Sequence, residues 1–160
     1  MNYEKHYYLF ANEIYDIKPN SSKIYKMVIK LNQNIKWLAF GLCDKKKVEE
    51  NNFQFVPSKR LYEERNNGSY ILNINCKIWN TNNHSECKKL KNLENKNLGE
   101  AGKVIEFHFI PNKELLQYYT DKELLASLTN IKLFKSEVFT PCIIFLQNCS
   151  IEVSFDYPDI

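Results

Sequence analysis

The chain has 160 residues, of which 44% are hydrophobic and 26% are charged, and this is the composition of an ordinary globular domain. A chain of this length can bury enough apolar surface to fold without disulfides or a metal. The formal net charge of +3 is too small to favour a nucleic-acid partner, because such proteins carry a clustered basic face. The sequence therefore predicts one domain over residues 1–160, with its core at about 21–155.

Three features of the sequence indicate an intracellular protein. The first ten residues carry charge and lack the apolar segment of a signal peptide. No stretch approaches the roughly 18 apolar residues that a membrane-spanning helix needs. The five cysteines are odd in number and contain no CxxC pair, which favours a reducing compartment. We expect a cytoplasmic or nuclear protein that does not insert into a membrane.

Alternating apolar and polar residues predict β-strands along most of the chain. In the stretch 69–79 every even position is apolar, which predicts a half-buried strand or hairpin after the turn residues Asn66-Asn67-Gly68. Many short strands separated by turns are typical of an all-β, two-sheet antiparallel sandwich. Further strands are expected at 25–31, 37–42, 104–110, 115–119, 142–146 and 151–155.

Three segments lie outside this alternation. Thr120 and Glu123 have the Ser/Thr-x-x-Glu spacing of a helix capping box, and leucines follow at helical spacing, so we expect one short helix near residues 121–128. The stretch 80–100 is rich in Asn and Lys and has no period, which predicts a long surface loop. The basic run 45–47 is interpreted as a solvated loop.

Four loose motifs, taken in order, resemble the SPRY (B30.2-like) domain family. They are the Trp…Gly-Leu stretch at 37–42, the Gly-Ser-Tyr strand from Gly68, the Gly-x-x-Ile hairpin from Gly102, and the Pro-Cys strand from Pro141 with the closing strand 151–155. The resemblance covers residues 21–155. It implies a β-sandwich that binds another protein, alone or as a subunit of a larger assembly, and catalyses nothing.

The sequence departs from the family pattern at two places. Members usually have Gly-Asp where Gly102-Lys103 stands here, which puts the acidic contact of that turn in doubt. They also usually continue as strand through the segment 121–128, for which the capping-box pattern predicts a helix.

Residues typical of binding hot spots gather in one predicted loop. Arg60, Tyr62 and Arg65 precede the Asn-Asn-Gly turn, and Tyr, Trp and Arg are favoured at interfaces because they bury much area and keep a polar tip. Loops at one end of SPRY-like sandwiches form a shallow peptide-binding surface. The resemblance therefore implies a partner-binding surface made of Arg60, Tyr62, Arg65 and the exposed side of Trp79. A plain solvated loop is the competing interpretation.

Neither a metal site nor a catalytic site follows from the sequence. His84 and Cys87 form one close ligand pair with Cys76 upstream, whereas structural zinc needs four ligands with paired spacing. Cys43 could pair with His84 or His108 as nucleophile and base, but Cys43 ends an apolar strand. The cysteines are better explained as small buried apolar residues, and His108 as a surface residue. No metal and no cofactor are expected.

Two functions from other classes stay open. The first is a carbohydrate-binding jelly roll, in which exposed aromatic rings stack on sugars; the lack of a signal peptide and of an Asp-rich loop counts against it. The second is an enzyme, either a thiol hydrolase or a metal-dependent one. No nucleophile, base and orienting residue can be assembled at defensible spacing, which counts against it.

Overall fold

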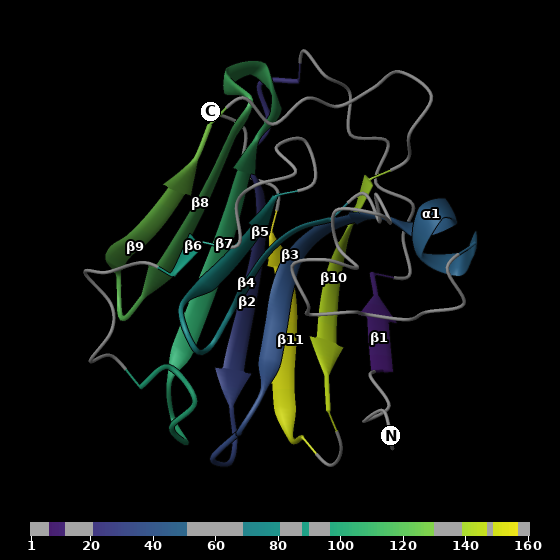
Figure 1. Cartoon of the computed structure of the whole chain (residues 1–160). Helices are drawn as coiled ribbons and strands as arrows, with labels where there is room; N and C mark the ends of the chain where they lie inside the picture. The colour runs from purple at the N-terminus through teal and green to yellow at the C-terminus, as the bar shows by residue number, and fades with distance from the viewer. Residues whose placement is uncertain are drawn as a thin grey trace.

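The computed structural model describes residues 7–11, 21–50, 69–80, 88–89, 97–129, 139–146 and 149–156. These residues form two antiparallel sheets that pack face to face (Figure 1). The predicted all-β sandwich is confirmed. In this part of the chain no helix has the length and hydropathy needed to cross a bilayer.

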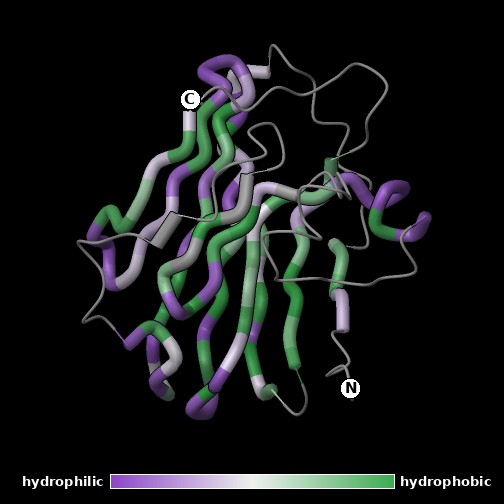
Figure 2. Tube along the Cα trace, viewed as in Figure 1, coloured by the Kyte–Doolittle hydropathy of each residue, from purple (hydrophilic) through white to green (hydrophobic). Residues whose placement is uncertain are grey.

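One layer is a six-stranded sheet with the strand order β1-β10-β3-β4-β5-β6. Its central strands β3 and β10 are buried along almost their whole length, and Figure 2 shows that they are mostly apolar. A continuous apolar run is expected where both faces of a strand are covered. In the sheet order, the strands are β1 (Tyr7–Phe10), β10 (Phe139–Phe145), β3 (Leu38–Asp44), β4 (Ser69–Asn73), β5 (Lys77–Asn80) and β6 (Lys88–Lys89).

The other layer is a five-stranded sheet with the order β11-β2-β7-β8-β9. Apolar and polar residues alternate along β2 and β7, so one face of this sheet is buried and the other is accessible (Figure 2). The strands are β11 (Ile151–Asp156), β2 (Tyr25–Leu31), β7 (Val104–Ile110), β8 (Leu115–Thr120) and β9 (Glu123–Leu128).

Aromatic rings fill much of the space between the two sheets. Tyr118 of β8 meets Phe40 of β3 edge-on, with ring centroids 5.6 Å apart, and its other neighbour Phe107 is 5.8 Å away. Rings at these distances and tilts attract one another beyond the effect of area burial. This contact joins β3 of one layer to β8 of the other.

A second apolar cluster covers the outer face of the six-stranded sheet. Its core members are fully or almost fully buried, and Tyr8, Phe10 and Trp37 pack around them. The short helix α1 (Lys45–Glu50) contributes Val48 to this cluster. The outer face of this sheet is therefore not open to solvent at these positions. The core members are Ala39, Cys43, Val48, Ile71, Cys142 and Ile144.

The interpretation of residues 45–47 as a loop is wrong, because they begin helix α1. The Asp44 side chain accepts a hydrogen bond from the backbone N–H of Lys47 at 3.3 Å, which satisfies one of the free donors of the first turn. Lys45 and Lys46 each lie near the glutamate one turn later, at 3.9 and 4.0 Å. Local capping and ion pairs thus favour a helix where the charge run indicated only solvation.

The helix predicted near residues 121–128 is also wrong, because this segment is the second arm of a β-hairpin. Asp121 and Lys122 have φ values of 51° and 69° and form the two-residue turn between paired Thr120 and Glu123. Positive φ at both central positions matches the turn that two-residue hairpins prefer. The Thr120 hydroxyl does not cap a helix: it donates to the Val104 carbonyl at 3.2 Å.

Two other expectations have mixed outcomes. The stretch 69–79 is a hairpin, as predicted, and Cys76 lies in its turn at a φ of 61°. The expected surface loop at 80–100 lies largely outside the described residues. Within it, Lys88–Lys89 form the strand β6 and not a loop. At its end Asn97 and Glu100 are exposed, whereas Leu98 is buried and the Gly99 carbonyl accepts a 2.7 Å hydrogen bond from the Ile35 backbone.

Candidate functional site

The predicted binding residues are placed only in part. Arg60, Tyr62 and Arg65 lie outside the described residues. Trp79 lies in β5, where it pairs in register with Ile71. The predicted loop surface therefore lies outside the described residues, apart from the backbone of Trp79.

Among the described residues, the outer face of the five-stranded sheet is an accessible surface with hydrogen-bonded polar side chains. Strand register places its outward side chains in two rows that cross all five strands, and we call this surface the outer face. The first row runs from Asp156 through Lys26, His108 and Gln117 to Ser127. The second row runs from Ser154 through Val28, Glu106 and Tyr119 to Leu124.

Glu106 lies at the centre of the outer face and is held by two donors. Its Oε2 atom accepts from Lys26 Nζ at 2.9 Å and from His108 Nε2 at 3.0 Å. Partial burial alone would raise the pKa of Glu106, but the hydrogen bonds and charges of Lys26 and His108 outweigh it and lower that pKa below its ordinary value. The carboxylate is therefore ionised and fixed in position at neutral pH.

An aromatic and apolar patch adjoins this charged centre. Tyr119 donates its hydroxyl proton to Gln117 Oε1 at 3.0 Å, and its ring lies 4.7 Å from the His108 ring. Next to it in register, Leu124 of β9 is 53% exposed. A β-bulge between Tyr118 and Tyr119 shifts the register here. The outer face thus combines fixed polar groups with an accessible leucine.

The described residues do not bring a nucleophile to a base. His108 lies on the outer face of one sheet, whereas Cys43 belongs to the apolar cluster on the outer face of the other sheet. The sandwich core separates the two, which excludes the Cys43–His108 pair. His84 lies outside the described residues. Within those residues no group of three or more His, Cys, Asp or Glu is placed to hold a metal.

The described cysteines are mostly buried. Cys43, Cys76 and Cys142 are buried, as predicted, while Cys149 is partly exposed. Burial, followed by the contact with Cys142, raises the pKa of the Cys43 thiol, and burial also raises that of Cys149. A raised thiol pKa leaves little of the reactive thiolate at neutral pH. His108 is on the surface of the sheet, as predicted, although its neighbours half-bury it.

Sequence patterns missed most of the outer face. Alternation along 104–110 indicates that Glu106 and His108 share a polar side of one strand. It does not indicate that Lys26 of β2 and Tyr119 of β8 lie next to them. That information is in the strand register, which depends on long-range pairing.

Comparisons with known proteins agree with this architecture. No protein-family model and no curated protein sequence matches the chain. Among solved structures, the SPRY domain of human HERC1 is similar with a TM-score of 0.55 and 10% identity, over 88% of this chain and 78% of that chain. The chain shares its fold with a SPRY domain. At this identity the likeness extends to the fold and not to the binding residues.

Two carbohydrate recognition domains are more distant. That of Emp46p, in a potassium-bound form, has a TM-score of 0.47 and 12% identity, over 95% of this chain and 76% of that chain. That of Emp47p has a TM-score of 0.40 and 8% identity, over 84% of this chain and 69% of that chain.

Proposed function

We propose that this protein is a non-catalytic protein-recognition module that binds its partner through the outer face of the five-stranded sheet. One observation carries the proposal: the polar groups of this face are partly exposed and already fixed, whereas the described apolar cluster on the outer face of the six-stranded sheet is buried. The fold similarity to a SPRY domain supports a binding role. Side chains that are ordered before binding lose little conformational entropy when a partner arrives.

Tyr119 and Leu124 are the expected anchors of this interface. Tyr119 offers ring area next to a polar tip, and the exposed Leu124 offers apolar area that a partner can cover. Lys26 and Glu106 already neutralise each other, so they contribute more to orientation and partner choice than to affinity. The interface would thus have apolar anchors on the β8–β9 side and charged groups on the β2–β7 side.

Affinity capture with quantitative mass spectrometry tests the proposal. Wild-type protein is compared with Leu124→Arg, which places a charge among the anchors, and with Glu49→Arg on helix α1 as the control. We expect one set of proteins to be retained by wild type and by the control but reduced about tenfold for Leu124→Arg. Equal capture by all three, with the fold intact by circular dichroism, would contradict the proposal.

A glycan array run with the same three proteins addresses carbohydrate binding. Saturable binding of one glycan, lost in Leu124→Arg and kept in Glu49→Arg, would assign the outer face to a sugar instead of a protein. No glycan binding is expected.

The loop residues Arg60, Tyr62 and Arg65, with Trp79, form a second part of the proposal. Because β5 belongs to the six-stranded sheet, they would form a second contact surface, separate from the outer face. Once a partner is known, the Tyr62→Ala/Arg65→Ala pair tests this. Affinity equal to wild type, in a folded variant, would remove the loop from the binding surface.

A further inference from the structure

The carboxylate at the centre of the outer face has hydrogen-bonding capacity that the fold does not use. Lys26 Nζ at 2.9 Å and His108 Nε2 at 3.0 Å both contact the same oxygen of Glu106, Oε2. Within the described part of the chain, the second oxygen, Oε1, accepts no hydrogen bond. A carboxylate accepts through both of its oxygens, and 20% of this side chain is exposed. Glu106 therefore keeps an acceptor that a partner can reach.

The contact with Glu106 also fixes which ring nitrogen of His108 carries the proton. An ionised carboxylate only accepts hydrogen bonds, so Nε2 of His108 is the donor. The other nitrogen of a neutral imidazole, Nδ1, then has a lone pair and is an acceptor. The ring of Tyr119 lies 4.7 Å from the His108 ring. The centre of the outer face thus presents acceptors beside two flat rings.

The charge of this surface is opposite in sign to the charge of the whole chain. The chain has a formal net charge of +3. The outward positions of β2, β7 and β11 instead carry two cations and three anions. A positively charged group of a partner is therefore attracted to this side of the outer face. The charged outward residues are Lys26, Lys30, Glu106, Glu152 and Asp156.

Strand register sets the distance between the open carboxylate and the exposed leucine. Glu106 pairs with Tyr119, and Tyr119 pairs with Leu124, so the three side chains lie in one row on adjacent strands. Neighbouring strands are about 4.8 Å apart, which places Leu124 about 10 Å from Glu106. A partner that covers Leu124 thus has a second contact point one row-length away, at the carboxylate.

We propose that the outer face recognises an arginine of the partner protein, whose guanidinium donates to Glu106 and lies against the rings of Tyr119 and His108, while a neighbouring apolar residue covers Leu124. Arginine recognition rests on the proposed function and adds the chemistry of the partner to it. A guanidinium combines several N–H donors with a planar face that stacks on aromatic rings, whereas a lysine offers only its point charge. An extended segment advances about 3.3 Å per residue, so an arginine about two to four residues from the apolar residue spans the distance.

A partner carboxylate fits the outer face less well. Among the described residues that form its two rows, Lys26 is the cation available to such a group. Its Nζ already lies 2.9 Å from Glu106, and Asp156 stands opposite it in register. A carboxylate that binds Lys26 would approach both acidic side chains, and like charges at neighbouring positions repel. The basic partner is therefore favoured.

Selection from a random peptide library displayed on phage tests the chemistry of the partner. Wild-type protein captures the peptides, and those that Leu124→Gln captures equally well are discarded because they bind elsewhere. This variant removes the exposed leucine and adds no charge. We expect the remaining peptides to be enriched in arginine, at about two to four residues from a large apolar residue. Enrichment of aspartate or glutamate without arginine would contradict the proposal.

Substitutions then assign the contact, with the affinity of a selected peptide measured by fluorescence anisotropy. Glu106→Gln should weaken binding about fivefold, and replacing the arginine of the peptide with lysine about threefold. Lys26→Met removes a competing cation and should tighten binding about twofold. Glu49→Gln on α1 is the matched control, because it also removes a carboxylate paired with a lysine, at 3.9 Å from Lys45. It should bind as wild type does.

Two affinity results would overturn arginine recognition. One is wild-type affinity in Glu106→Gln. The other is equal weakening by Glu106→Gln and Lys26→Met, which would mean that the ion pair only maintains the shape of the surface. If Leu124→Gln weakens binding and Glu106→Gln does not, the proposed function stands and arginine recognition alone fails. If no selected peptide distinguishes wild type from Leu124→Gln, both fail.

Discussion

Tyr118 and Tyr70 connect the two sheets through a buried hydrogen bond. The Tyr118 hydroxyl, on β8, donates to the backbone carbonyl of Tyr70, on β4, at 3.3 Å. Gly41 of β3 makes room for this contact: a Cβ atom there would lie 2.1 Å from the same carbonyl oxygen and 3.0 Å from the hydroxyl. A missing side chain on one strand therefore permits a polar bond between the layers.

Replacing Tyr118 with Phe should remove this bond and keep the ring. We expect the free energy of unfolding to fall by about 1 kcal/mol, because a buried hydrogen bond contributes that much on average. Urea denaturation followed by tryptophan fluorescence measures the change. An unchanged midpoint would mean that the hydroxyl contributes nothing to holding the layers together.

Replacing Gly41 with Ala should cost more than removing the hydroxyl. The added methyl group meets a backbone oxygen, which cannot rotate away as a side chain can, and we expect a loss of about 2 to 3 kcal/mol. Gly102→Ala is the matched control. Gly102 has a φ of 84° and nothing within 4 Å of an added Cβ, so only backbone strain of about 1 kcal/mol is expected. Equal losses in the two variants would exclude the proposed clash at Gly41.

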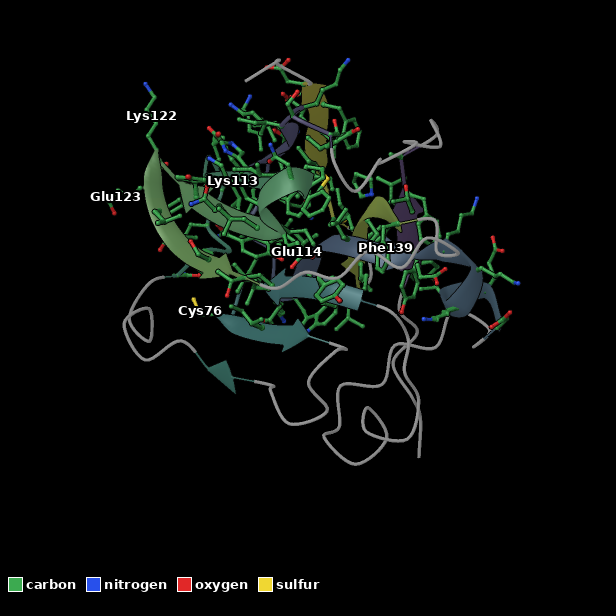
Figure 3. All side chains as sticks on the ribbon, turned by 90° about the horizontal axis from the view of Figure 1, so that it is seen from above. Cys76, Lys113, Glu114, Lys122, Glu123 and Phe139 are labelled. Atoms are coloured by element: carbon green, nitrogen blue, oxygen red, sulfur yellow. The ribbon has the colours of Figure 1, made fainter. Side chains whose placement is uncertain are left out.

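Replacing Lys122 with Gly should stabilise the protein. Lys122 has a φ of 69° at the second central position of the β8–β9 turn, where glycine is favoured, and Figure 3 shows its side chain pointing away from the body. We expect a gain of about 0.5 to 1 kcal/mol in thermal or urea denaturation. A helix at 121–128 would respond in the opposite direction, since glycine destabilises a helix interior. Asp121, the other central residue of the turn, is left unchanged in this variant, because its side chain accepts a 2.7 Å hydrogen bond from Lys103.

The successes and failures of sequence interpretation have physical causes. Alternation predicted β2 and β7 because one face of each is buried and the other is mostly polar. It predicted β11 because apolar residues there alternate with polar ones, although none of them is fully buried. The Thr120–Glu123 spacing led to a wrong prediction because a capping box is a local pattern, whereas five residue pairs with β8 decide the conformation. The adjacency of Glu106 and Tyr119 follows from strand register, which no short motif contains.

The described cysteines should resist modification in the folded protein. Cys43 and Cys142 are fully buried side by side in the apolar cluster, and burial raises the pKa of Cys43. We expect iodoacetamide to label Cys149 first, slowly, and to label Cys43 and Cys142 only after unfolding. Peptide mapping by mass spectrometry distinguishes the sites. Rapid labelling of Cys43 in the native protein would show that its cluster is open.

Acid should weaken the protein partly through Glu106. Lys26 and His108 lower the pKa of Glu106 in the folded state below its ordinary value of 4.5, so the unfolded state binds a proton more readily. The stability that this carboxylate contributes is therefore fully present above about pH 4.5 and is lost as the pH falls through the lower, folded-state pKa.

The Glu106→Gln variant should accordingly be less stable than wild type at pH 6, and the difference should shrink as the pH decreases from about 4.5. Lys26→Met provides the control, because loss of its 2.9 Å ion pair moves the pKa of Glu106 back up and makes the acid dependence of that variant shallower. Urea midpoints measured every half pH unit test both. A difference in stability between wild type and Glu106→Gln that stays constant down to pH 3 would mean that Lys26, Glu106 and His108 do not interact in solution. The outer face would then have no fixed polar centre.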